Sequence, residues 1–112
     1  MTFAGSVPEG SWARLVMANE DHMLEDVRKT ADRTVAMLGG VPPQLALLVS
    51  CVGRRHVLGQ RTEDEIDAVA EACSGGVPIT GFYSYGELCT SGPGLPAELH
   101  NETMTISMFA EV

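Results

Sequence analysis

The sequence predicts an α/β domain: a mixed β-sheet with helices packed on it, in the order β-α-β-α-β-β. Two stretches repeat apolar residues every three or four positions, which is the period of a helix face. Short apolar runs that suit strands alternate with these stretches. Strand, helix and strand in close succession indicate parallel, right-handed crossovers. A chain of 112 residues is the size of one domain.

The chain begins with two contrasting segments. Residues 1–10 contain Gly, Ser and Pro and are expected to form a flexible arm ahead of a domain at 11–112. The run SWARLVMA at 11–18 predicts the first strand. Asn19, Glu20 and Asp21 then end the strand and provide candidate helix N-caps.

The first helix and the second strand follow in turn. One helix face is formed by apolar residues that end at Gly39 and Gly40, namely Leu24, Val27, Ala31, Val35 and Leu38. The nearly continuous apolar run at 45–52 predicts a central strand covered on both faces.

Residues that begin or end helices and strands divide the second half of the chain. Thr62 and Glu65 have the spacing of a capping box, which predicts the start of a second helix. Its buried stripe is expected to contain Ile66, Val69, Ala70 and Cys73. The run at 79–89 predicts a third strand, and the alternating run at 103–110 predicts a fourth. These two are expected to be antiparallel neighbours joined by a surface loop at 90–98.

Composition excludes several classes of protein. The net charge of -8 argues against nucleic acid or an anionic membrane as partner. No apolar run is long enough for a membrane span, and the first ten residues are not expected to form a secretory signal. Cys51, Cys73 and Cys89 are odd in number and widely spaced, so we expect no disulfide framework, no metal site and a reducing cytoplasm. No set of nucleophile and base has a catalytic spacing, so the sequence does not predict an enzyme.

A glycine and an arginine follow the central strand and are candidate ligand-binding residues. Ligands of open α/β sheets gather outside the carboxyl ends of parallel strands. Arg54 could bind a carboxylate there with both arms of its guanidinium, and Gly53 would let the backbone approach the ligand. The alternative is that Arg54 offsets nearby acidic residues at the surface.

The stretch TGFYSYGEL at 80–88 holds three of the six aromatic residues. In a strand, Tyr83, Tyr85 and Glu87 share one face, which suits a pocket wall with a partner for a cationic group. Structural packing is the alternative. His100 and Asn101, at the mouth of the last strand, complete the candidate ligand-binding set.

Three longer segments carry a family resemblance: LLVSCVGRRHVLGQRTEDE, PITGFYSYGEL and ELHNETMTISMFAE. In this order and spacing they resemble the C-terminal half of FIST sensory domains. The resemblance implies a cytoplasmic input module of signal transduction that senses small molecules, with amino acids proposed as ligands. It also implies an N-terminal FIST half or a signalling output protein as partner.

Two alternatives to a ligand sensor remain open. One is an interaction or oligomerisation module without ligand. A homodimer is expected through apolar surface left uncovered by an N-terminal half, with Met17, Met104, Met108 and Phe109 as candidates. The other, which the family resemblance also implies, is a haem-linked nitric-oxide sensor with His100, His22 or His56 as axial ligand. No cofactor is expected, however, because so few aromatic residues are available for a haem slot.

Overall fold

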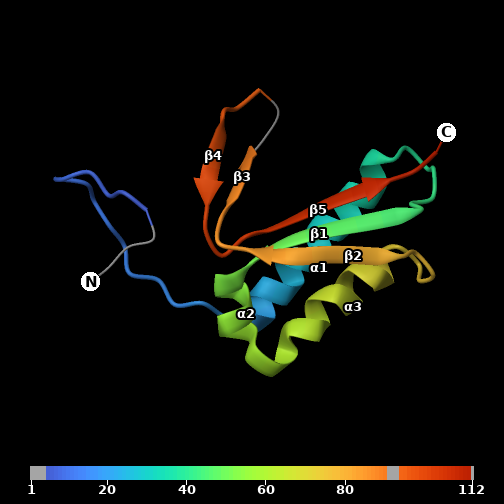
Figure 1. The fold of residues 1–112 in the computed structure, drawn as a ribbon, viewed down its shortest axis with the longest axis horizontal. Coiled ribbons are helices and arrows are strands. Elements are labelled where there is room, and N and C mark those ends of the chain that lie inside the picture. The colour runs from blue at the N-terminus through green and yellow to red at the C-terminus, as the bar shows by residue number, and fades with distance from the viewer. Residues whose placement is uncertain (1–4, 91–93, 112) are drawn as a thin grey trace.

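A three-stranded mixed sheet forms the centre of the molecule, as a computed structural model that describes residues 5–90 and 94–111 shows (Figure 1). Strand β1 (Leu45–Cys51) lies between β2 (Ile79–Ser84) and β5 (Met104–Phe109). It is parallel to β2 and antiparallel to β5. Residues 1–4 of the expected arm and 91–93 of the expected loop lie outside the described residues.

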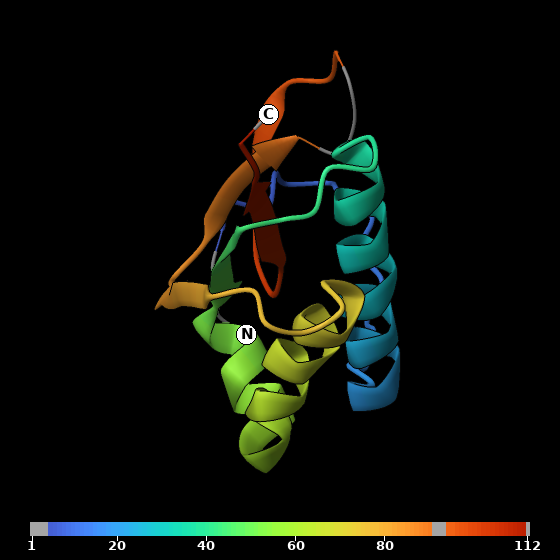
Figure 2. The same cartoon turned by 90° about the vertical axis from the view of Figure 1, so that its right-hand side faces the viewer.

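Two long helices lie on the same side of this sheet (Figure 2). They are α1 (Glu20–Met37) and α3 (Thr62–Ala72). A short helix α2 (Val52–Leu58) and the 3₁₀ turn η1 (Gly59–Arg61) connect β1 to α3. The sequence pattern does not predict α2, because two turns are too few to establish a helical period. The α/β class and the mixed sheet are confirmed.

A second, two-stranded sheet projects from the end of β2 (Figure 1). It is the antiparallel hairpin of β3 (Glu87–Thr90) and β4 (Ala97–His100). The single strand expected at 79–89 is therefore wrong, because a bend at Tyr85 and Gly86 divides it. The expected pairing of the third and last strands is also wrong, since β1 lies between β2 and β5.

Helix α1 begins where the sequence predicts. The side chain of Asn19 accepts a hydrogen bond of 3.0 Å from the backbone N–H of His22, which caps the first turn. Leu24, Val27 and Ala31 are buried against the sheet and α3. Gly39 adopts the left-handed region (φ +63°) just past the end, as helix termini favour.

The capping box predicted for α3 does not form. The hydroxyl of Thr62 donates to the carbonyl of Gly59, and no side chain caps this terminus. Glu65 is instead buried, so the buried stripe differs from the expected one. Val69 and Cys73 are buried as expected, and Glu65 and Ala68 are buried with them, whereas Ile66 is 44% exposed.

The core lies on one face of the sheet only. Ala46 and Leu48 of β1 point toward the helices and are buried, and their neighbours on β5 pack with them. The other face holds Leu47, Val49 and Phe109, which are half-buried or exposed. The expectation that β1 would be covered on both faces is wrong, because both long helices lie on the same side.

The strand predicted at 11–18 is also wrong. These residues are extended but have no strand partner among the described residues, and they run clear of the sheet (Figure 1). Trp12, Leu15 and Met17 are 102%, 87% and 93% exposed. The structure therefore lacks the first strand of the predicted order β-α-β-α-β-β, and its first element is α1.

Candidate functional site

The carboxyl ends of β1 and β2 meet the loop that precedes β5. The backbone N–H of Cys51 donates to the carbonyl of Thr103 over 2.9 Å, which holds this loop on the end of β1. Helix α2 begins immediately afterward. A Cβ at Gly53 would stand 3.0 Å from Cγ of Glu102, so glycine permits the close approach of this loop.

Arg54 is buried beneath this loop and is held by the protein itself. Its Nε donates to Oε1 of Glu65 over 2.7 Å, and the two side chains form a salt bridge. It also donates to the carbonyls of Glu102 (3.2 Å) and Met23 (3.4 Å). Arg54 thereby joins α2 to α3, α1 and the loop before β5. The N–H groups of Arg54 that were expected to bind a ligand carboxylate therefore bind protein oxygens instead.

Glu87 is likewise engaged with its neighbours. It is 5% exposed, and its Oε2 accepts a 2.6 Å hydrogen bond from the hydroxyl of Thr103. Its Oε1 accepts a hydrogen bond from Ser84. Arg54 and Glu87 thus contact adjacent residues of the same loop, Glu102 and Thr103, and both are bonded internally.

The remaining candidates have different surroundings. Tyr83 is 39% exposed, and the guanidinium carbon of Arg55 lies 5.2 Å from the centre of its ring, within range of a cation–π interaction. Tyr85 is 92% exposed. His100 is paired with Glu87 in the hairpin, and its Nε2 is buried without a partner among the described atoms. Asn101 is exposed at the following turn.

A cavity of about 200 Å³ lies along β2, and Tyr83 forms part of its wall. Leu48 and Met104 line it from β1 and β5, and Ile66 lines it from α3. The other lining residues belong to β2, namely Ile79, Thr80, Gly81 and Phe82. Apolar side chains dominate this lining, which suits the apolar part of a small ligand.

Ser50 adds a polar group near one end of this cavity. In the sheet it stands beside Tyr83 on one side and Met104 on the other, and both of these line the cavity. Ser50 is 4% exposed, and its hydroxyl has no hydrogen-bond partner within the described residues. Such buried polar groups usually have one. A polar residue inside the apolar run at 45–52 was the sequence signal for this site.

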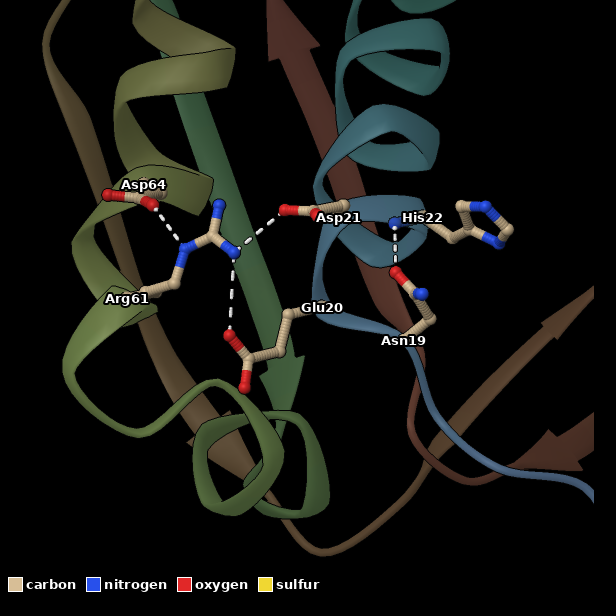
Figure 3. Close-up of polar contacts among 6 residues, drawn as sticks. All are labelled: Asn19, Glu20, Asp21, His22, Arg61 and Asp64. Carbon is tan, nitrogen blue, oxygen red and sulfur yellow. Dashed lines mark hydrogen bonds and ion pairs between the residues drawn. The ribbon is translucent and has the colours of Figure 1, made fainter.

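A network of charges joins the starts of α1 and α3 (Figure 3). Arg61 donates to Asp64 over 3.0 Å and to Asp21 over 2.8 Å, and more weakly to Glu20. The hydrogen bonds that the guanidinium donates to Asp21 and Asp64 raise the pKa of Arg61. All three carboxylates lie in first helical turns, where negative charge is favoured. We interpret Arg61 as a structural clamp.

Residues 5–90 and 94–111 contain neither a metal-ligand cluster nor a membrane-spanning helix. No three side chains of His, Cys, Asp or Glu gather closely enough there to hold a metal ion. No helix in that part of the chain is both long and apolar enough to cross a membrane.

The chain belongs to the FIST C domain family, a class of sensory signalling domain, whose match covers residues 1–90. Among curated proteins it is similar to two uncharacterized proteins from two strains of Mycobacterium tuberculosis. Each is 36% identical over 90 residues, which cover 78% of this chain and 22% of the relative. The chain thus spans less than a quarter of the length of these relatives. No solved structure matches it significantly.

Proposed function

We propose that the chain is a non-catalytic input domain of a cytoplasmic signalling system, which binds a small molecule in the cavity beside β2. The observation that carries the proposal is the apolar cavity with the unpartnered hydroxyl of Ser50 near one end. A ligand there would bridge α3 and β2 through Ile66 and Tyr83. Occupancy would therefore alter the packing of helix on sheet, which a neighbouring output protein could sense.

The chemistry of the cavity favours a particular class of ligand. An apolar body would fill the space between Leu48, Ile66 and Met104. A hydrogen-bonding group would satisfy Ser50, and a carboxylate would suit the cationic Arg55 beside Tyr83. Small apolar amino acids and short organic acids have these features. We propose that Arg55 takes the role that the sequence analysis gave to Arg54, because Arg54 is bonded internally.

Native mass spectrometry of the chain tests this proposal. We would incubate it with leucine, phenylalanine, 3-phenylpropionate and 2-phenylethylamine, and expect an adduct of one chain with one probe. Ile66→Trp fills the cavity and should abolish the adduct, whereas Leu88→Trp, at a hairpin position that is 75% exposed, should retain it. The proposal would be wrong if no adduct forms, or if Ile66→Trp binds as wild type does.

A protein-interaction module is the second candidate function. The observation that favours it is the uncovered face of the sheet, where Leu45, Phe82 and Phe109 are 38%, 62% and 51% exposed. An N-terminal FIST half is the partner that we propose for this face. Substitution of Phe109 by Ser should weaken such binding without changing small-molecule binding in the cavity.

A further inference from the structure

The extended segment at residues 11–18 carries apolar side chains that contact little of their own chain. Trp12, Leu15, Val16 and Met17 are 79–102% exposed. In extended backbone, Ala13, Leu15 and Met17 project to one side, and Trp12, Arg14 and Val16 project to the other. One side is thus apolar, and on the other side Arg14 stands between two apolar residues, which suits the outer strand of a sheet. Exposed apolar groups of this kind mark an interaction surface.

The sheet offers a free edge that matches this segment. β5 is an outer strand, and the described residues include no strand on its far side. Its Met104, Ile106 and Met108 face the helices and are only partly buried, and Phe109 on the other face is 51% exposed. A strand added beside β5 would therefore cover apolar side chains on both faces. The apolar residues of the added strand would be removed from water at the same time.

Chain geometry selects the β5 edge rather than the β2 edge. The helices α1 and α3 lie on the same face, and crossovers in one sheet share one hand. A parallel strand before α1, then β1, then β2 must therefore follow one another across the sheet in a single direction. Since β2 lies on one side of β1, the strand before α1 belongs on the opposite side, beyond β5. It would run antiparallel to β5.

The connection between this segment and α1 is too short for it to reach the β5 edge of its own chain. Only Asn19 separates residue 18 from the helix, and Asn19 is extended (φ -123°, ψ 117°) and caps α1. A strand that folds back beside its own helix ordinarily needs a loop of about 2–6 residues. Short hinges favour exchange of the element between two copies instead.

We infer that residues 11–18 of one copy add to the β5 edge of a second copy, and that the exchange is reciprocal. Each chain then donates one strand and accepts one, which closes a symmetric dimer. Each sheet gains a fourth strand in the place that the chain geometry assigns to it. The contact lies on the outer edge of β5, whereas the cavity is lined mainly by β2 and reaches β5 only at Met104.

Trp12 provides a direct probe of this exchange, because it is the one tryptophan of the chain. We expect light scattering to give twice the chain mass of 11.9 kDa. We also expect the emission of Trp12 to shift to shorter wavelength as the protein concentration is raised through the dimer transition. A monomer at all concentrations, or a dimer without a change in Trp12 emission, would overturn the inference.

Matched proline substitutions locate the contact. The double variant Leu15→Pro with Val16→Pro removes two successive backbone N–H groups, one of which points toward β5 in either register, and both residues are exposed, so folding should persist. We expect this variant to be monomeric, whereas Ser6→Pro, outside the segment, should remain dimeric. A double variant that dimerises as wild type does would contradict strand exchange.

Lengthening the hinge distinguishes exchange from docking within one chain. Insertion of three glycines between Ala18 and Asn19 should let the segment reach its own β5. We expect a monomer whose Trp12 emission stays at short wavelength at every concentration. If the wild-type chain itself behaves in this way, the segment docks in its own chain and the dimer is wrong. If the insertion leaves the dimer unchanged, the hinge argument is wrong.

Discussion

Arg54 and Glu65 form a buried ion pair that joins α2 to α3, although they stand eleven positions apart in the chain. Their side chains are 9% and 1% exposed. Arg54 extends the contact to backbone carbonyls of α1 and of the loop before β5. One guanidinium therefore links four parts of the chain around the carboxyl end of β1.

Removal of one partner of this pair should be strongly destabilising. Arg54→Met leaves the carboxylate of Glu65 buried without its cation, which ordinarily costs about 3–5 kcal/mol. Urea denaturation would measure the loss, and Arg28→Met at an exposed helix position should change stability little. The double variant Arg54→Met with Glu65→Leu should recover much of the loss. If Arg54→Met is as stable as Arg28→Met, the pair does not hold these elements together.

Ser50→Ala should weaken ligand binding without lowering the stability of the fold. The Ser50 hydroxyl lacks a protein partner among the described residues, so its removal should leave the free energy of unfolding unchanged or higher. The same substitution should weaken binding of a probe that bonds to this hydroxyl by about 0.5–1.5 kcal/mol. Calorimetric titration and urea denaturation of the same variant would test both statements. A large loss of stability would mean that Ser50 has a structural partner.

Gly81 should tolerate no side chain. A Cβ at this position would overlap the carbonyl group of Leu48 on the neighbouring strand, so the parallel pairing of β1 with β2 would have to shift. We expect Gly81→Ala to lower the free energy of unfolding by about 1–3 kcal/mol, as measured by urea denaturation. Gly5→Ala is the matched control, because a Cβ there meets nothing within 4 Å. Equal stability of the two variants would contradict this close strand approach.

Stability should fall at alkaline pH partly because of Cys73. Burial raises the pKa of the Cys73 thiol. The neutral thiol therefore contributes stability that is complete below the ordinary thiol pKa of about 8.5 and is lost as pH rises through the raised value. Cys73→Ala should show a smaller fall in the free energy of unfolding above about pH 8.5. Identical slopes in the two proteins would contradict the assignment.

Haem should not bind tightly to this domain. The cavity beside β2 has about 200 Å³, which suits a small ligand but is below the ~300–1,000 Å³ of pockets that hold larger, drug-sized molecules. Titration with hemin should give no sharp Soret band that depends on His100. A sharp band in the wild-type protein that His100→Ala abolishes would contradict this expectation and favour the haem-linked alternative.

The parts of the fold that local sequence determines were predictable. The helix face of Leu24, Val27 and Ala31 and the cap at Asn19 appear as expected. The strand at 11–18 was wrong because strand formation requires a neighbour, which the local pattern does not provide. The capping box was wrong because Glu65 bonds to a distant arginine rather than to its own helix terminus.

Only part of the candidate site could be predicted from the local sequence. The position of Tyr83 follows from strand alternation, but the alternation ends where β2 bends after Ser84. Ser84 then lies three positions before Glu87 and bonds to it, which no strand pattern indicates. The roles of Thr103 and Arg55 could not be predicted, because each contacts a residue that lies far away in the sequence. Thr103 bonds to Glu87, and Arg55 lies over the ring of Tyr83.

Chemical-shift mapping of backbone amides tests the ligand cavity most directly. The ¹⁵N-labelled chain would be titrated with a panel of small carboxylates, amines and uncharged apolar fragments. We expect the fragments that bind to shift the amides of Ile79, Gly81 and Tyr83 on β2 and of Ile66 on α3, which line the cavity. Binding that shifts only the uncovered face around Leu45 and Phe109, or no binding by any fragment, would contradict a sensory cavity beside β2.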